Sequence, residues 1–149
     1  MACVALGVLS SVPGPADAGV CHISATQIDF GRFDPLVRGR SQSVGYLTYN
    51  CTLTVINVRI RLSAGQSQNG SQRVVGVVGD GRSIPYSLAL DPSQTQIWGD
   101  GFGATSLYMA SGAPAHTDIR VPIYAVLLNM TVPRVGLYTD TITAQLSWE

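Results

Sequence analysis

The chain has 149 residues and a mass of 15.7 kDa, the size of one domain that can bury its own core. Only 12% of the residues are charged and 46% are apolar, which excludes a disordered chain and disfavours a free cytosolic protein. Nine basic residues, all arginine, balance nine acidic ones, so we expect no attraction to nucleic acid or anionic lipid.

Residues 1–18 have the pattern of an export signal. Residues 1–9 form an apolar run that is too short to span a bilayer, and a Pro-Gly-Pro break follows. Ala16-Asp17-Ala18 gives the small-x-small motif of a cleavage site, which predicts a mature chain of residues 19–149. The usual basic segment is absent, so we expect the natural start to lie further upstream. The alternative is a strand, because four apolar residues alternate with smaller ones: Val4, Leu6, Val8 and Val12.

Two cysteines, Cys21 and Cys51, remain if residues 1–18 are removed. An even pair in an exported chain predicts one disulfide. It would close a loop of about thirty residues and stabilise the fold by roughly 3–4 kcal/mol. Two buried free thiols are the alternative. Together with His22 and His116 these cysteines give no recognised zinc-ligand spacing, so we expect no metal site.

After residue 20 the apolar residues recur with period two, and no window sustains the period of a helix. The predicted strands cover residues 22–30, 44–51, 53–62, 73–78, 85–90, 118–129 and 136–148. In the third of these, one face is expected to carry four apolar residues: Ile56, Val58, Ile60 and Leu62. Asn69-Gly70 predicts a hairpin turn, and Pro122 indicates a sheet edge or a bulge.

The segment 136–148 alternates in the same way. Its apolar face is expected to hold Tyr138, Ile142, Ala144, Leu146 and Trp148. Seven or eight strands divided by Gly/Pro turns, without helices between them, predict an all-β antiparallel sandwich in one domain.

The sequence contains few residues that could act in catalysis. Its single glutamate is Glu149, and four of its eight aspartates lie beside Gly or Pro, where turn formation explains them. Nucleophile elbows, phosphate-binding loops and dinucleotide fingerprints are absent from the sequence. We therefore expect no catalytic residue and no cofactor.

The segment that begins Cys21-His-Ile-Ser and ends Phe30-Gly-Arg-Phe-Asp-Pro35 resembles the opening of spore coat protein U domains. These domains are the subunits of archaic chaperone–usher pili. Cys51 resembles the second cysteine of the family, at the end of its strand B. Further segments follow in the family's order: Arg73, Pro85-Tyr-Ser-Leu, Trp98-Gly-Asp-Gly and Val135-Gly-Leu-Tyr-Thr-Asp-Thr-Ile-Thr. The resemblance extends from Cys21 to Trp148.

This resemblance implies an incomplete immunoglobulin-like antiparallel β-sandwich that is completed by donor-strand complementation. Such a domain lacks its last strand, which leaves a groove beside the C-terminal strand, here residues 136–148. A periplasmic pilus chaperone would fill the groove first, and a neighbouring pilin subunit would replace it at an outer-membrane usher. Strand addition of this kind combines backbone hydrogen bonds with pockets for alternate side chains. The implied location is extracellular, in a fimbrium or at the cell surface.

Residues 1–18 decide the place of such a subunit in a fibre. Family pilins that polymerise carry an alternating donor segment ahead of the first cysteine. Cleavage after Ala18 would leave only Gly19 and Val20 there, too few at about 3.3 Å per residue to span a groove. The subunit would then accept a strand without giving one, as at a pilus tip. If residues 1–18 are retained, they would supply a donor strand suited to the shaft, with three alternating residues: Val4, Leu6 and Val8.

The leading hypothesis is a fimbrial subunit that acts in surface adhesion and biofilm formation. A secreted spore or cell-coat protein of the same fold, acting without an usher, is the alternative, and an extracellular enzyme or small-molecule binder is a third. Adhesive contacts are expected in end loops. The candidates are Trp98, Phe102, Leu107, Tyr108 and Met109. For Trp98 the alternative is a place in the core beneath its loop.

Overall fold

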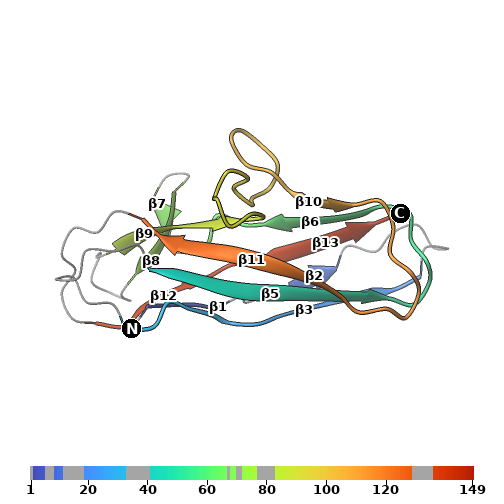
Figure 1. The fold of residues 1–149 in the computed structure, drawn as a ribbon, viewed down its shortest axis with the longest axis horizontal. Helices are drawn as coiled ribbons and strands as arrows, with labels where there is room; N and C mark the ends of the chain where they lie inside the picture. Colours follow the sequence, from blue (N-terminus) through green and yellow to red (C-terminus); the bar gives the residue numbers. More distant parts are fainter. Residues whose placement is uncertain are drawn as a thin grey trace.

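A computed structural model describes residues 2–5, 9–11, 19–32, 41–66, 68–69, 72–76, 83–128 and 136–149. Every regular element in these segments is a β-strand, which confirms the all-β prediction (Figure 1). The described residues contain no helix that is long and apolar enough to cross a membrane.

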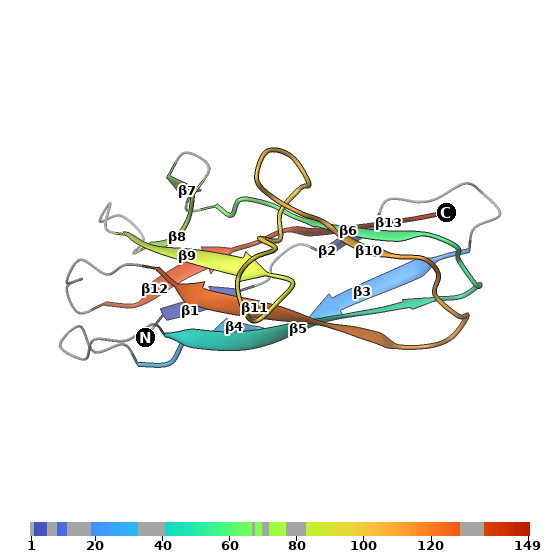
Figure 2. The ribbon, with the colours of Figure 1, turned by 45° about the horizontal axis from the view of Figure 1, so that its top comes forward.

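The strands form two sheets that curl around a common core (Figures 1 and 2). They are β1 (Ala2–Ala5), β2 (Leu9–Ser11), β3 (Cys21–Ala25), β4 (Ile28–Asp29), β5 (Gln42–Cys51), β6 (Val58–Leu62), β7 (Gln68–Asn69), β8 (Gln72–Gly76), β9 (Ser83–Ala89), β10 (Tyr108–Ala110), β11 (Ile119–Leu127), β12 (Tyr138–Thr141) and β13 (Ala144–Trp148). The larger sheet has the order β3-β5-β11-β9-β8-β12-β1-β4, with β7 paired to β8. The smaller sheet has the order β10-β6-β13-β2. The pairs are antiparallel except β1 with β12 and β2 with β13, which are parallel.

The strand β6 shows how alternation builds the core. Val58, Ile60 and Leu62 are buried between the sheets, whereas the two arginines between them are exposed. The expectation for Ile56 is wrong, because its side chain is 69% exposed. The chain turns before β6 begins: the Ile56 N–H donates to the Glu149 carbonyl, and Val55 is buried instead.

The bounds of the predicted strands shift by a few residues, and the strands predicted at 22–30 and 136–148 are each divided into two. The predicted strand 22–30 is divided into β3 and β4, because Thr26 leaves the ladder and exchanges hydrogen bonds with Tyr46 through its backbone N–H and its hydroxyl. Pro122 lies within β11, in the part that pairs with β5 but not yet with β9, whose pairing begins at Tyr124. β11 is an interior strand of the larger sheet, so the prediction of an edge strand is wrong, and a residue without an N–H is tolerated only because β9 does not reach this end of β11. The Asn69-Gly70 hairpin appears as the pairing of β7 with β8, while Gly70 lies outside the described residues.

Candidate functional site

The last strand of the chain crosses from one sheet to the other. β12 lies next to β8 in the larger sheet, and β13 pairs along its whole length with β6 in the smaller sheet. The crossing occurs at residues 142–143, where the backbone of Thr143 is held by Ser63. The Ser63 hydroxyl accepts a hydrogen bond from the Thr143 N–H at 2.9 Å, and the Ser63 N–H donates to the Thr143 carbonyl. One continuous segment of the chain therefore belongs to both layers of the sandwich.

The face of this strand that the sequence marked as apolar is turned into the core. The five predicted residues are all buried members of the hydrophobic cluster: Tyr138, Ile142, Ala144, Leu146 and Trp148. Their placement agrees with the alternation in the sequence.

Asp140 is a buried member of the same face that the sequence analysis did not select. It is 3% exposed, and its Oδ2 accepts a hydrogen bond of 2.6 Å from the Tyr86 hydroxyl. Its Oδ1 accepts hydrogen bonds from the N–H groups of Gln66 and Thr141. The position between Tyr138 and Ile142 in a period-two pattern was the signal that could have identified it.

Two further buried polar groups adjoin Asp140. Burial raises the pKa of the Tyr86 phenol, and the hydrogen bond to Asp140 raises it further. Burial lowers the pKa of Arg73, while the charges of nearby acidic groups, Asp140 among them, oppose that effect. The Arg73 guanidinium donates to three carbonyls, those of Leu62, Ser63 and Trp98, and so ties β8 to the end of β6. Because the buried Arg73 guanidinium is satisfied by these carbonyls, we assign it a structural role in the sandwich.

The outer edge of the last strand is covered by the N-terminal segment of the same chain. β1 pairs with β12 and β2 pairs with β13, both in parallel (Figure 1). The sequence analysis expected no further strand at this edge, and the described structure corrects that expectation. Residues 6–8 and 12–18, which include Leu6, Val8 and the Ala-Asp-Ala motif, lie outside the described residues.

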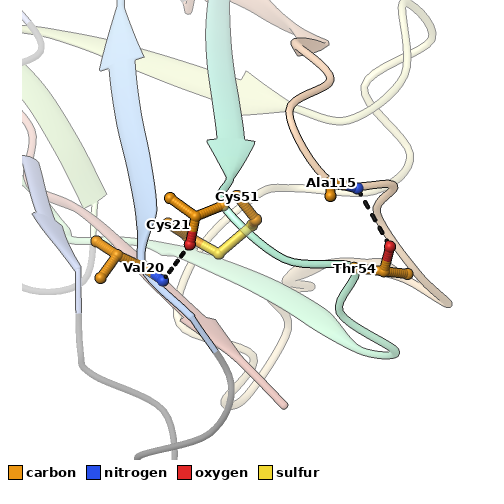
Figure 3. Close-up of a disulfide and its surroundings, with 6 residues drawn as sticks. Val20, Cys21, Cys51, Thr54 and Ala115 are labelled. Atoms are coloured by element: carbon orange, nitrogen blue, oxygen red, sulfur yellow. Dashed lines mark hydrogen bonds between the residues drawn. A yellow bond between two sulfur atoms is a disulfide. The ribbon is translucent and has the colours of Figure 1, made fainter.

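The predicted disulfide is present between Cys21 and Cys51, with an S–S distance of 2.06 Å (Figure 3). It joins the first residue of β3 to the last residue of β5, which are register partners. The backbone just before it is also fixed, because the Val20 N–H donates to the Thr52 hydroxyl and the Thr52 N–H to the Val20 carbonyl. The described residues hold no group of three or more side chains suited to a metal ion.

The predicted contact residues differ in their exposure to solvent. Trp98 is fully buried, and its indole N–H donates to the Ile60 carbonyl at 2.9 Å. This corrects its assignment as a surface contact in favour of a place in the core beneath the loop. Phe102 and Met109 are 71% and 69% exposed. The other two residues, Leu107 and Tyr108, are half-buried. The expectation of a loop is wrong for Tyr108 and Met109, because both lie in β10 and pair with β6.

The loop that carries Phe102 is held by its own side chains. The Asp100 carboxylate accepts hydrogen bonds from the Phe102 N–H and from the Thr105 hydroxyl, both at 3.0 Å. The Phe102 N–H contributes most to lowering the pKa of Asp100, and the Thr105 hydroxyl adds to it. An Asx-type turn of this kind presents the phenyl ring to solvent without a supporting core.

A cavity of about 550 Å³ lies beside this loop and is lined mainly by apolar surface. The polar side chains in its wall include Arg73, Tyr86 and Ser87. Each of the three already makes a hydrogen bond within the protein, to main-chain carbonyls, to Asp140 and to Gln94 respectively. The cavity therefore gives no support to the small-molecule hypothesis.

The sequence matches the spore coat protein U domain family over residues 9–145. No curated protein matches it significantly. A solved structure with a similar chain is the CsuC–CsuE chaperone–tip adhesion subunit pre-assembly complex from the archaic chaperone–usher Csu pili of Acinetobacter baumannii. The TM-score is 0.58 at 24% sequence identity, and the match covers 85% of this chain and 38% of that chain. The present chain thus spans well under half the length of that chain, and the likeness concerns the fold.

Proposed function

The chain belongs to the spore coat protein U domain family, and we propose that it is a structural subunit of a surface fibre assembled by strand addition. The observation that carries the proposal is the last strand, whose apolar face lies in the core and whose outer edge is paired with extended segments. The proposal assigns no catalytic role to the chain.

The geometry of this edge suits the binding of an extended segment. Because β12 belongs to one sheet and β13 to the other, a strand added along both would close the two layers together. Each backbone hydrogen bond of such a ladder contributes about 0.5–1.5 kcal/mol, and alternate side chains add packing against the core. An apolar edge left open would expose unpaired backbone groups and promote aggregation.

The proposed partners follow from the family and from the similar structure. That structure is a pre-assembly complex of a chaperone with a tip adhesion subunit. By analogy, we propose a periplasmic chaperone, an outer-membrane usher and neighbouring subunits as partners of this chain. The disulfide supports folding in an oxidising compartment, consistent with export through the periplasm to the cell surface.

Adhesion and biofilm formation are the proposed activity of the fibre, with Phe102 and Met109 as its contacts. Replacing both by serine should reduce the retention of fibre-bearing cells on polystyrene and leave the folding of the subunit unchanged. Val44→Ser is the matched control, because Val44 is also exposed, at 45%, but lies on β5 in the larger sheet. Equal retention of both variants would exclude these two residues as contacts.

Thermal unfolding of residues 19–149, purified in the oxidised form without a chaperone, tests strand addition. A synthetic peptide with the sequence of residues 1–18, with Cys3 replaced by serine, serves as the added strand. At a peptide concentration 100 times its Kd, the stabilisation should be about 2.7 kcal/mol. A high, reversible transition that the peptide does not change would contradict the proposal.

A secreted coat protein that works without an usher is the second candidate. The observation that favours it is the pairing of β1 and β2 with the last strand, because this pairing closes the sandwich without a second molecule. Genes for a chaperone and an usher beside the gene for this chain would favour the fibre subunit. Their absence, together with a stable monomer in solution, would favour the coat protein.

A further inference from the structure

Two tyrosines meet inside the sandwich, one from each sheet. Tyr49 comes from β5 of the larger sheet and is 1% exposed, whereas Tyr108 comes from β10 at the edge of the smaller sheet and is half-buried. Their hydroxyl oxygens are 3.4 Å apart, and their ring centroids are 6.2 Å apart with the ring planes at 63°. We propose that this pair is a site of oxidative modification, at which a carbon–carbon bond between the two rings, a dityrosine, joins the two sheets.

Other tyrosines of the core and surface are engaged with different groups. The Tyr86 hydroxyl donates to the Asp140 carboxylate, and the Tyr46 ring lies under the Arg120 guanidinium. Tyr49 and Tyr108 instead share a long hydrogen bond between two phenols, in which either oxygen can donate. Two rings that approach through their hydroxyl ends bring together the ring carbons beside the oxygens, where phenoxyl radicals couple.

Neither the disulfide nor a lysine isopeptide bond ties the two sheets together. The disulfide joins β3 to β5, and both strands belong to the larger sheet. The sequence contains no lysine, so an isopeptide bond from a lysine side chain is excluded. In the described structure β10 has three residues and pairs with β6 alone. An edge strand with so few backbone partners moves towards β5 at a lower cost than an interior strand would.

Tyr108 is the residue on which an oxidant would act. It is the most accessible member of a row of three aromatic rings, because Tyr49 and Trp98 are buried, and the Trp98 centroid is 6.0 Å from that of Tyr108. The oxidant we name is a peroxidase that uses hydrogen peroxide and removes one electron at a time. Loss of an electron from Tyr108, with loss of its phenol proton to water, produces a phenoxyl radical.

The hydrogen bond directs this radical to Tyr49. Burial raises the pKa of Tyr49, and the hydrogen bond with Tyr108 raises it further, so the Tyr49 hydroxyl retains its hydrogen. This hydrogen atom moves to the Tyr108 oxygen and leaves the radical on Tyr49. The Trp98 indole N–H donates to the Ile60 carbonyl, which does not take up a proton, so the same transfer is disfavoured from Trp98.

A second oxidation of Tyr108 completes the reaction. Each ring then carries one radical, and the carbons next to the two oxygens form the new bond. The hydrogens on these carbons move to the oxygens, so both phenols are restored. The pair loses two electrons and two protons in total, and one molecule of hydrogen peroxide takes them up to form two molecules of water.

Oxidation of the folded full chain tests the site. The protein, with its disulfide intact, is treated at low concentration with a peroxidase and hydrogen peroxide, and the monomer is isolated, reduced, digested and analysed by mass spectrometry. We expect a monomer lighter by the mass of two hydrogen atoms, in which fragmentation joins Tyr49 to Tyr108. A monomer without this bond, or with a bond between other tyrosines, would overturn the proposal.

Three variants and an unfolded control assign the bond. Tyr49→Phe and Tyr108→Phe should each abolish it, whereas Tyr46→Phe, the matched control, should retain it. Wild-type protein oxidised in urea should lose the bond, because only the fold brings the two rings together. The bond in Tyr108→Phe, or an equal yield in urea, would overturn the proposal. Tyr108 is only half-buried, so this variant remains informative even if Tyr49→Phe fails to fold.

The bond also has a measurable effect on stability. It closes a loop between positions that are 59 residues apart, which should lower the equilibrium constant of unfolding by up to about 10³-fold. An unchanged urea midpoint of the modified monomer would overturn the claim that the bond fits the native arrangement of the sheets. These results are independent of fibre assembly, which the effect of the peptide on residues 19–149 tests separately.

Discussion

The hydrogen bond between Tyr86 and Asp140 ties β12 to β9 inside the core. Tyr86→Phe removes the hydroxyl group that donates this hydrogen bond, and it leaves the shape of the core almost unchanged. Because the acceptor is a buried carboxylate at 2.6 Å, the loss should cost about 1.5–3 kcal/mol of unfolding free energy. For a domain of this size the melting temperature should fall by about 3–12 °C.

Urea unfolding of the oxidised full chain measures this cost directly. A lower midpoint with an unchanged slope indicates a loss of stability without a change in the surface exposed on unfolding. Tyr46→Phe is the matched control, because the Tyr46 ring lies under the Arg120 guanidinium at 3.6 Å and Phe keeps that ring. The control should remain within about 0.5 kcal/mol of the wild type. Equal stability of Tyr86→Phe and wild type would refute the claim that Tyr86 stabilises the buried carboxylate.

The same variant has a pH signature. Burial, with the hydrogen bond to Asp140, raises the pKa of Tyr86 in the folded chain. The phenol then ionises more readily in the unfolded chain, so its contribution is complete below the ordinary pKa of about 10 and is lost as the pH rises above it. Above that pH the wild type should lose up to about 1.4 kcal/mol per pH unit more than Tyr86→Phe. Parallel curves for the two proteins would exclude this linkage.

Three further substitutions test other parts of the fold by urea unfolding. Replacing Cys21 and Cys51 together by alanine should cost about 3–4 kcal/mol, since the residues are separated by 30 positions, and a loss below about 1 kcal/mol would contradict the loop-closure account. Trp98→Phe should cost about 2–4 kcal/mol, because it removes both a buried hydrogen bond and core volume, and a neutral result would place the indole at the surface. Gly65→Ala should cost about 1–3 kcal/mol, because Gly65 has a φ of +96° and an added Cβ would collide with the Asp140 carboxylate. An unchanged stability would show that the turn can adjust.

Local periodicity predicted the parts of the fold that depend on burial alone. The buried face of residues 138–148 follows from alternation, because successive side chains of a strand point to opposite sides. The same rule failed at Ile56, where the chain leaves the strand geometry and a hydrogen bond to the C-terminal residue fixes the turn. Periodicity cannot show where a strand begins when the residues before it are also apolar.

Contacts between distant segments could not be predicted in this way. Asp140 resembles a surface residue until Tyr86, 54 positions away, supplies its hydrogen-bond donor. Trp98 and Phe102 lie in one glycine-rich loop, yet only the first reaches the core, because a carbonyl of β6 accepts its indole N–H. The partner of the last strand is the most distant case, since it comes from the other end of the chain.

The account depends most on the claim that the edge formed by β12 and β13 binds an extended strand. Hydrogen–deuterium exchange of residues 19–149, with and without the peptide of residues 1–18, tests it directly. The account predicts that those amides of residues 138–141 and 144–146 that point away from β8 and β6 exchange rapidly in the fragment alone and become protected when the peptide is added, while the amides of β5 and β11 change little. The same exchange rates with and without the peptide would contradict it.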